Sequence, residues 1–293
     1  MNTYAIGLYE KAVPGNLNLR EKLEIAGNTG FDFLEISIDE SEEKLRRLDM
    51  GREERLELIK IMYETGTPIR SMCLSGHRRY PMGSGNPETE KRSMEIMEKA
   101  IDLADCLGIR VIMLAGYDVY YENRSHKTEA RFLENLKKAV GMAARSGIVL
   151  AFETMETEFM NTVEKAMKYV QAIHSPYLQV YPDIGNITNA ATVYGKSVLE
   201  DLKCGEGYLV AMHLKETLPG IFRDLMFGEG DVNFEDAIRL AWKMGVRRYV
   251  TEFWYSGSNC WEQELKAAYQ KMDTILSQQP DAVAVKNKWF DTF

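Results

Sequence analysis

The sequence has no long hydrophobic run. No window holds about 18 uninterrupted apolar residues, the length that a membrane-spanning helix requires. Its opening, MNTYAIGLYEKA, includes an acidic residue and no long apolar stretch, which is not the pattern of a secretory signal. We therefore expect no membrane partner, no export signal and a location in the cytoplasm.

Cysteine pairs and excess basic charge are also lacking. The four cysteines lie far apart, at positions 73, 106, 204 and 260, and form no CxxC motif, so we expect reduced thiols. Basic residues number 36 and acidic residues 44, which gives a net charge of −8. This charge, without a local basic run, argues against nucleic acid as a partner. The net charge does not exclude the binding of one small phosphate group by a few local cations.

What the sequence does contain is an alternation of short apolar runs and longer helix-like segments. The runs VIML, LQVY and LVAM are apolar without strict alternation, as is typical of parallel strands that are covered on both faces. Eight strands are predicted, at 5–8, 33–38, 69–74, 111–115, 149–152, 178–181, 208–213 and 249–253. The helices predicted between and after them span 19–28, 52–64, 87–107, 128–145, 162–173, 193–204, 234–244 and 261–275.

This repeat favours one domain, a single (β/α)8 TIM barrel of the α/β class. Eight units in 293 residues average about 37 residues each, close to the size of a barrel repeat. A doubly wound open sheet is the alternative, but GLYEKAVPG after the first strand is not a glycine-rich phosphate turn. We expect the barrel to occupy 1–275. The tail at 276–293 contains AVAV and WF, which predicts that it packs on the barrel or on a partner subunit.

The last four predicted strands each end near a residue that can bind a metal: Glu153, Asp183, His213 and Glu252. A single residue of this kind is more often a helix cap or a surface group. In a barrel, however, the active site lies at the carboxyl ends of the strands, so four such residues at equivalent strand ends would lie close together. Three buried carboxylates would repel each other without a cation among them. Three oxygen ligands and one imidazole suit Mn²⁺, Mg²⁺, Co²⁺ or Zn²⁺, and one such ion is predicted.

The segments around these residues resemble a known superfamily. FETM, YPDIGN, MHLKET and TEFW are similar to the metal-binding segments of the xylose-isomerase-like barrels. The longer segments SMCLSGHRRYPMGS and LAGYDVYYE resemble the L-ribulose-5-phosphate 3-epimerases, also called L-xylulose-5-phosphate 3-epimerases, of L-ascorbate and L-xylulose utilisation. The similarity extends over nearly the whole chain, from GLYEKA to FGEGDVNFE.

The resemblance implies an isomerase that interconverts L-xylulose 5-phosphate and L-ribulose 5-phosphate. Glu153, Asp183, His213 and Glu252 would hold the metal ion, and Glu153 and Glu252 would also be the acid and base. Inversion at C3 needs a proton removed from one face and returned to the other, which one base cannot do. The metal would stabilise the enediolate that forms. The resemblance also implies a homodimer.

Several further residues are candidates for substrate binding. Asn186 follows the strand-six Asp where related enzymes for free sugars have His, and as we interpret it this favours a phosphorylated substrate. Cationic candidates for the phosphate are Lys215, which we favour slightly, and His77, Arg78, Arg79 and Arg223. The HRR run at 77–79 is equally consistent with a solvated loop. Tyr9, Tyr117 and Tyr120 could line a sugar site or simply pack in the core.

Alternative functions remain open. An aldose–ketose isomerase or a non-phosphorylated ketose epimerase would share the metal site and differ in the phosphate contacts. A metal-dependent endonuclease on this barrel would need many histidines, and the chain has four. A non-catalytic sugar-binding barrel would not need paired acid–base carboxylates. The segment FGEGD at 227–231 is interpreted as a turn, with a lid over the site as the alternative.

Overall fold

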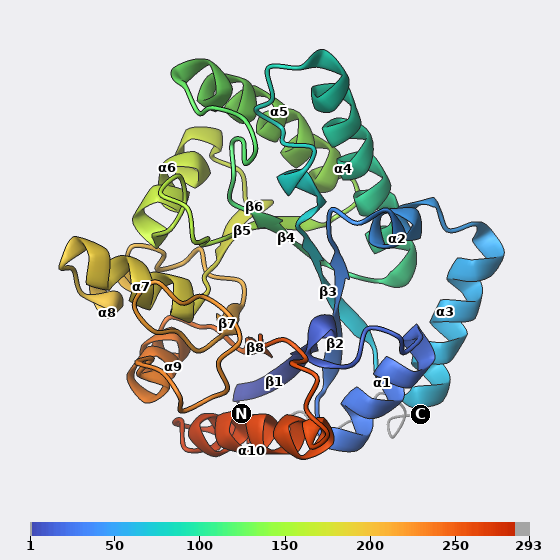
Figure 1. Ribbon diagram of the computed structural model, residues 1–293, viewed down its shortest axis with the longest axis vertical. Helices are drawn as coiled ribbons and strands as arrows, with labels where there is room; N and C mark the ends of the chain where they lie inside the picture. The colour runs from blue at the N-terminus through green and yellow to red at the C-terminus, as the bar shows by residue number, and fades with distance from the viewer. Residues whose placement is uncertain (1, 285–293) are drawn as a thin grey trace.

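Eight parallel strands form a ring, and the helices surround it (Figure 1). The computed structural model describes residues 2–284. The strands are hydrogen-bonded in the order β6-β5-β4-β3-β2-β1-β8-β7, and isolated parallel bridges between Val180 and Leu209 and between Asp183 and His213 join β6 to β7. The ring is therefore nearly closed, and the predicted (β/α)8 barrel is confirmed.

The strands of the ring are β1 (Asn2–Tyr9), β2 (Phe33–Ile38), β3 (Ile69–Leu74), β4 (Val111–Ala115), β5 (Val149–Glu153), β6 (Leu178–Tyr181), β7 (Met212–Leu214) and β8 (Arg248–Thr251). The helices are α1 (Leu19–Thr29), α2 (Glu42–Leu45), α3 (Arg52–Thr65), α4 (Pro87–Leu107), α5 (His126–Arg145), α6 (Val163–Ile173), α7 (Ile184–Tyr194), α8 (Val198–Lys203), α9 (Phe234–Lys243) and α10 (Trp261–Ser277). Every residue of β2 and β4 is buried, as parallel strands covered by helices require.

Local signals in the sequence explain where the helices begin and end. The side chain of Asn86 accepts a hydrogen bond from the backbone of Glu88, and Pro87 occupies the first position of α4, where no N–H donor is needed. Gly108 ends the same helix with φ of 74°, a left-handed conformation that glycine adopts at no steric cost. Most predicted helices accordingly start and stop within two residues of the observed ones.

Two predicted elements between β6 and α9 are wrong in their bounds. Instead of one helix at 193–204, the chain forms α7 directly after Asp183, turns at Gly195 and then forms α8. The seventh strand is Met212–Leu214, not 208–213. The segment before it still closes the barrel, because the backbones of Tyr208 and Val210 exchange hydrogen bonds with Val180.

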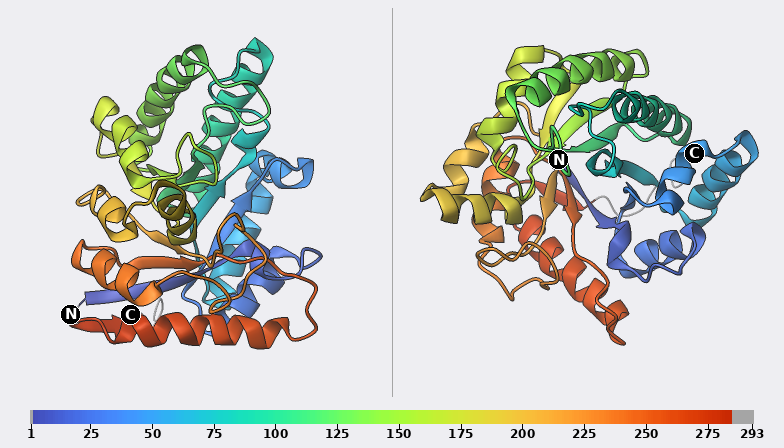
Figure 2. Two further views of the ribbon diagram at one scale, coloured as in Figure 1. Left: turned by 60° about the vertical axis from the view of Figure 1, so that its left-hand side comes forward. Right: turned by 45° about the horizontal axis from the view of Figure 1, so that its top comes forward.

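The last described segments of the chain, which follow β8, lie beside the first strand of the barrel. Helix α10 runs to Ser277, two residues further than predicted, and lies beside the N-terminal strand (Figure 2). A short strand, β9 (Ala282–Ala284), then pairs in parallel with β1. Residues 285–293 lie outside the described part of the chain, so packing of the tail at 276–293 on the barrel or on a partner stays a prediction. Among residues 2–284, no helix is both long and apolar enough to cross a bilayer.

Candidate active site

The four predicted metal ligands come from four neighbouring strands of the ring. Glu153 is the last residue of β5, Asp183 follows β6 by two residues, His213 lies within β7, and Glu252 follows β8 directly. All four side chains are buried, and one ligand atom from each lies within 4.8 Å of all the others. The fold therefore brings together the four residues that the sequence singled out, in a cluster that could hold a metal ion.

His213 stands at the centre of this cluster. Its Nδ1 atom lies 3.2 Å from Oε1 of Glu153 and 2.8 Å from Oε2 of Glu252. Its other ring nitrogen points away from the two carboxylates. The imidazole thus offers one nitrogen to the cluster and one to the barrel interior.

Asp183 is oriented by the helix that follows it. Its Oδ1 atom accepts a hydrogen bond of 2.8 Å from the backbone N–H of Asn186 and so caps α7. At Gly185 a Cβ atom would lie 2.8 Å from the backbone oxygen of Lys215, so only glycine lets this first turn approach β7 so closely. The cap uses one carboxylate oxygen of Asp183 and leaves Oδ2 facing the cluster.

The second oxygen of Asp183, Oδ2, fits a metal ligand. Lys215 Nζ lies 2.7 Å from Oδ2, but within residues 2–284 this buried oxygen has no hydrogen bond of normal geometry. Lys215 Nζ also donates to Oδ1 of Asn186 at 2.9 Å and lies 3.8 Å from Oε2 of Glu252. One ammonium therefore lies beside two of the three carboxylates, and a divalent cation would offset the charge that remains.

Burial and mutual charge shift the pKa values of these groups. Burial raises the pKa of Glu153, and it raises the pKa of Asp183 to about 7 although Lys215 acts in the opposite direction. Burial acts against ionisation of Glu252 too, but attraction by Lys215 and His213 holds its pKa below the ordinary value. The two glutamates are thus in different electrostatic environments although both are buried beside His213.

A fourth buried carboxylate adjoins the cluster, that of Glu35 in the middle of β2, and the sequence did not reveal it. Its Oε1 atom lies 2.7 Å from Nε2 of His213, on the side of the imidazole away from the cluster. The only signal in the sequence is a charged residue within the apolar strand FLEISI. Nothing in that strand reveals a partner 178 residues away in the chain.

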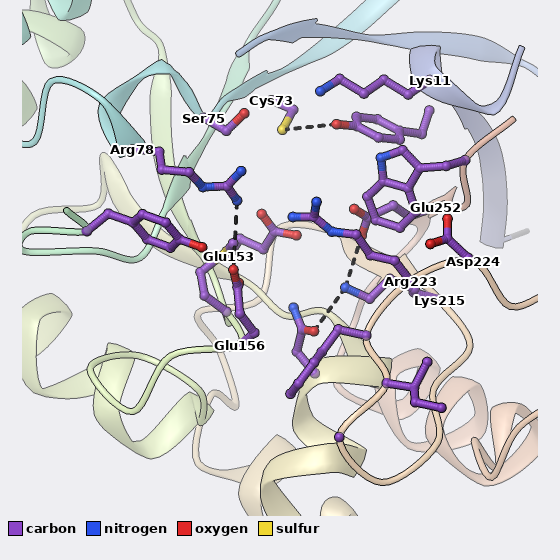
Figure 3. Close-up of a pocket in the computed structure, with 18 of the residues that line it drawn as sticks. Lys11, Cys73, Ser75, Arg78, Glu153, Glu156, Lys215, Arg223, Asp224 and Glu252 are labelled. Atoms are coloured by element: carbon purple, nitrogen blue, oxygen red, sulfur yellow. Dashed lines mark hydrogen bonds and ion pairs between the residues drawn. The ribbon is translucent and has the colours of Figure 1, made fainter. Parts of the chain in front are cut away.

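A cavity of about 510 Å³ opens above the cluster (Figure 3). Glu153, Glu252, Lys215 and Asn186 line it. The polar atoms of Glu153, Glu252 and Lys215 point toward its centre (Figure 3). This volume is within the range of small-molecule sites, and it places two carboxylates of the cluster against whatever molecule enters.

Most of the predicted substrate-binding residues line this cavity. Tyr9 packs edge-on against Trp254, with ring centroids 5.9 Å apart. Arg78 donates to the hydroxyl of Tyr117 at 3.2 Å and lies over the ring of Tyr120. The predicted residues that line the cavity are Tyr9, Arg78, Tyr120, Asn186, Lys215 and Arg223.

His77 and Arg79 are not among the lining residues, although they flank Arg78. His77 is buried under α4, with Nε2 3.1 Å from the backbone oxygen of Ser93. Burial lowers its pKa to about 4, so it is uncharged near neutral pH and cannot offer a cation to phosphate. Arg79 faces solvent and pairs with Glu42 at 2.8 Å. The expected roles of these two residues in phosphate binding find no support in their positions.

Further residues that the sequence did not single out line the cavity. Lys11 follows β1 and pairs with Asp39, and Glu156 accepts a hydrogen bond from Tyr117. The cavity-lining residues missed in the sequence include Lys11, Cys73, Ser75, Tyr121, Met155, Glu156, Ile221, Phe222, Asp224 and Trp254. Several follow barrel strands directly, so position after a strand end was the available signal.

The segment FGEGD is a turn held down by a buried carboxylate. Glu216 accepts hydrogen bonds from the backbone N–H groups of Gly228 and Val232, at 2.8 and 3.1 Å. A Cβ atom at Gly230 would lie 2.2 Å from the backbone oxygen of Thr217. These contacts favour the turn interpretation over a lid.

The xylose isomerase-like TIM barrel family model matches residues 23–275. The chain therefore belongs to the xylose isomerase-like TIM barrel family. It is 44% identical over 250 residues to L-ribulose-5-phosphate 3-epimerase UlaE of Escherichia coli O139:H28, covering 85% of this chain and 87% of the relative. The protein of the same name from Shigella sonnei is equally similar. Like these relatives, the chain is a carbohydrate epimerase, which is an isomerase.

Solved structures show the same fold at much lower sequence identity. D-psicose 3-epimerase from Clostridium cellulolyticum H10, solved with D-tagatose, has a TM-score of 0.77 at 15% identity, covering 93% of this chain and 99% of that one. A structure of L-ribulose 3-epimerase has a TM-score of 0.75 at 16% identity, covering 94% and 95%. At these identities the similarity supports the barrel fold and does not by itself identify the substrate of this chain.

Proposed function

We propose that the enzyme inverts C3 of a ketopentose 5-phosphate, interconverting L-xylulose 5-phosphate and L-ribulose 5-phosphate. One observation carries this proposal: Glu153 and Glu252 come from different strands, flank the same nitrogen of His213 and both line the cavity. Two carboxylates that reach one bound sugar from two directions are what inversion beside a ketone requires. The names of the relatives at 44% identity support the choice of substrate.

In this proposal the two glutamates exchange roles with the direction of the reaction. One carboxylate takes the proton from C3, and the other returns a proton to the opposite face. A divalent metal ion, held by Glu153, Asp183, His213 and Glu252, would supply charge stabilisation where negative charge develops on the ketone oxygen. Lys215 and Asn186, which already share a hydrogen bond, bind substrate hydroxyl groups beside the cluster.

Arginine side chains at the cavity wall bind the phosphate in this proposal. Arg223 is exposed and stacks on Trp254, 5.2 Å from the ring centroid, so its guanidinium is held at the cavity without a carboxylate partner among residues 2–284. Arg78 has a buried Nε atom that lacks a hydrogen bond in the same part of the chain. Both can bind phosphate oxygens through several N–H groups at once. Lys215 is less available than these arginines for the phosphate, because its ammonium lies against Asp183 and Asn186 beside the cluster.

Proton NMR in D₂O tests the reaction. Each pentulose phosphate is incubated with the metal-loaded enzyme, and deuterium at C3 together with appearance of the other epimer is expected. Exchange at C1 instead would indicate an aldose–ketose isomerase. Faster turnover of the free ketoses than of their phosphates would indicate a non-phosphorylated ketose 3-epimerase. Either result would overturn the proposed activity.

A cytoplasmic location and a homodimer complete the proposal. All four cysteines are free, which suits a reducing compartment. Cell fractionation with an antibody tests the location, and sedimentation at several protein concentrations tests the dimer.

A further inference from the structure

One buried carboxylate has no place in the proposed proton transfer. Glu35 is fully buried, lies inside the barrel below the metal-binding cluster and contacts His213 from the far side. Its Oε1 atom is 2.7 Å from Nε2 of His213, a short distance for an N–H···O hydrogen bond. The imidazole is thus held between Glu35 below and the two glutamates above.

The other oxygen of Glu35 is held by two neutral donors. Ser71, on β3, donates from Oγ to Oε2 at 2.6 Å, and the hydroxyl of Tyr181, on β6, donates to the same oxygen at 3.1 Å. Side chains from β2, β3, β6 and β7 therefore meet across the barrel interior. This arrangement fixes the position of the carboxylate independently of anything bound in the cavity.

Fold stability does not account for Glu35. The other residues of β2 are apolar apart from Ser37, and the strand is buried along its length. A carboxylate in such an interior costs desolvation energy that an apolar side chain of similar size avoids. The hydrogen bonds from Ser71 and Tyr181 reduce this cost, and the contact with His213 links Glu35 to the metal-binding cluster.

We propose that Glu35 is a positioning residue for the metal site. By accepting a hydrogen bond from Nε2–H of His213, it selects the tautomer in which Nδ1 carries a lone pair and faces Glu153 and Glu252. A carboxylate in this position also makes the imidazole a stronger electron donor to a cation. The inference rests on the proposed metal site, and it adds a residue that touches neither the substrate nor the ion.

Metal affinity tests this role directly. Mn²⁺ binding is measured by electron paramagnetic resonance of the free ion for the wild type and for Glu35→Gln, which keeps the shape and can still accept from Nε2. Loss of the negative charge is expected to weaken Mn²⁺ binding about 10–100-fold. Tyr181→Phe and Ser71→Ala each remove one hydrogen-bond donor to Glu35 and are expected to weaken Mn²⁺ binding about 2–10-fold.

Asp32→Asn is the matched control. It also removes a carboxylate that is largely buried. Asp32 lies three residues before Glu35, at the end of the barrel opposite the cluster, and its Oδ2 accepts a hydrogen bond from the backbone N–H of Ile6. Mn²⁺ affinity is expected to match the wild type. A loss as large as that of Glu35→Gln would assign the effect to general loosening of the barrel and overturn the proposal.

The Nε2 proton of His213 gives a readout that does not depend on activity. The chain has four histidines, so ¹⁵N NMR of the histidine rings in the Zn²⁺-loaded protein can resolve His213. Because the ion occupies Nδ1, Nε2 carries the proton with or without Glu35, and the hydrogen bond to Glu35 is read from the chemical shift and solvent exchange of that proton. We expect a downfield, slowly exchanging Nε2 proton in the wild type and an upfield or rapidly exchanging one in Glu35→Leu. An unchanged Nε2 proton signal together with unchanged Mn²⁺ affinity in the variants would overturn the positioning role and leave the proposed function intact. A wild type that binds Mn²⁺ without epimerising the pentulose phosphates would overturn the function and leave the positioning role intact.

Discussion

Lys215 places its ammonium nitrogen 2.7 Å from Oδ2 of Asp183, in a position where both side chains are buried. The same ammonium is bound by Asn186, whose own amide nitrogen donates to the backbone oxygen of Thr154 at 2.7 Å. The cation is thus tied to the loops after both β5 and β6. Lys215 partly neutralises the carboxylate cluster and fixes its geometry before any ligand enters.

Lys215→Met should destabilise the metal-free protein and make its stability more dependent on metal. Breaking a buried ion pair costs about 3–5 kcal/mol, and we expect about 3 because Asp183 can take up a proton instead. Mn²⁺ should then raise the Tm of the variant more than that of the wild type. Urea unfolding and calorimetry with and without Mn²⁺ measure both effects. The exposed Lys60→Met is the control, and an equal rise in Tm for Lys215→Met and wild type would contradict this role.

Glu153→Gln and Glu252→Gln should each slow interconversion of the two pentulose phosphates by about 10²–10⁴-fold, because an amide cannot accept the C3 proton. If the two glutamates serve opposite faces, the remaining exchange of the C3 proton in D₂O should be confined to one epimer. That epimer should differ between the two variants. Metal content measured on the same samples separates loss of a base from loss of the ion. Equal residual exchange from both epimers would refute the two-base assignment.

The main features of the site could be predicted because they are local in the sequence. Glu153, Asp183, His213 and Glu252 each interrupt or end an apolar run, and parallel strands in a barrel bring such ends together. The (β/α)8 fold followed from the same alternation. These predictions needed no knowledge of which side chains touch.

The remaining features depend on contacts that the sequence does not encode locally. His77 and Arg78 are neighbours in one short turn, yet one is buried against α4 and the other lines the cavity. Helix α7 was missed because YPDIGN contains proline and glycine and so suggests a loop, whereas the side chain of Asp183 caps a helix there. In both cases tertiary packing selected one of two locally allowed conformations.

Arg223→Met should weaken binding of phosphorylated substrates specifically. A hydrogen bond to a charged group contributes about 1.5–3 kcal/mol, so KM for L-xylulose 5-phosphate should rise about 10–100-fold. KM for the free ketose should stay the same. Arg78→Met should act in the same direction but also disturb Tyr117. Arg79→Met, which replaces an exposed arginine outside the cavity, is the control. Equal changes in KM for the phosphorylated and free sugars would remove Arg223 from the phosphate site.

Glu10 should support the barrel mouth and make the fold sensitive to acid. Its buried carboxylate contacts Lys22, Lys44 and Arg47, and burial alone would raise its pKa, but these cations hold the pKa well below the ordinary value of 4.5. Its contribution to stability is therefore fully present above about pH 4.5 and is lost as the pH falls further. The free energy of unfolding of Glu10→Gln should be about 3–5 kcal/mol lower than that of the wild type at pH 7. It should then fall less than that of the wild type as the pH is lowered.

Urea unfolding of the wild type and Glu10→Gln at pH 7 and across the acid range measures this contribution. Glu43→Gln, on the exposed side of α2, is the control and should behave as the wild type. The prediction fails if wild type and Glu10→Gln lose stability in parallel as the pH falls.

Asp32 should have the opposite pH dependence. Burial raises its pKa from 3.8 to about 7, although the backbone N–H of Ile6 donates to it at 2.8 Å. The folded state then binds a proton that the unfolded state releases, so this contribution is present below about pH 3.8 and is lost as the pH rises through about 7. Asp32→Asn keeps an acceptor for Ile6 and cannot ionise. Its free energy of unfolding should therefore exceed that of the wild type at pH 8, and the difference should vanish or reverse near pH 4.

Nearby Asp273 also raises the pKa of Asp32, so Asp273→Asn should shift this transition to lower pH. Urea titrations at several pH values measure all three proteins, and parallel curves for wild type and Asp32→Asn would show that Asp32 is already ionised in the folded protein.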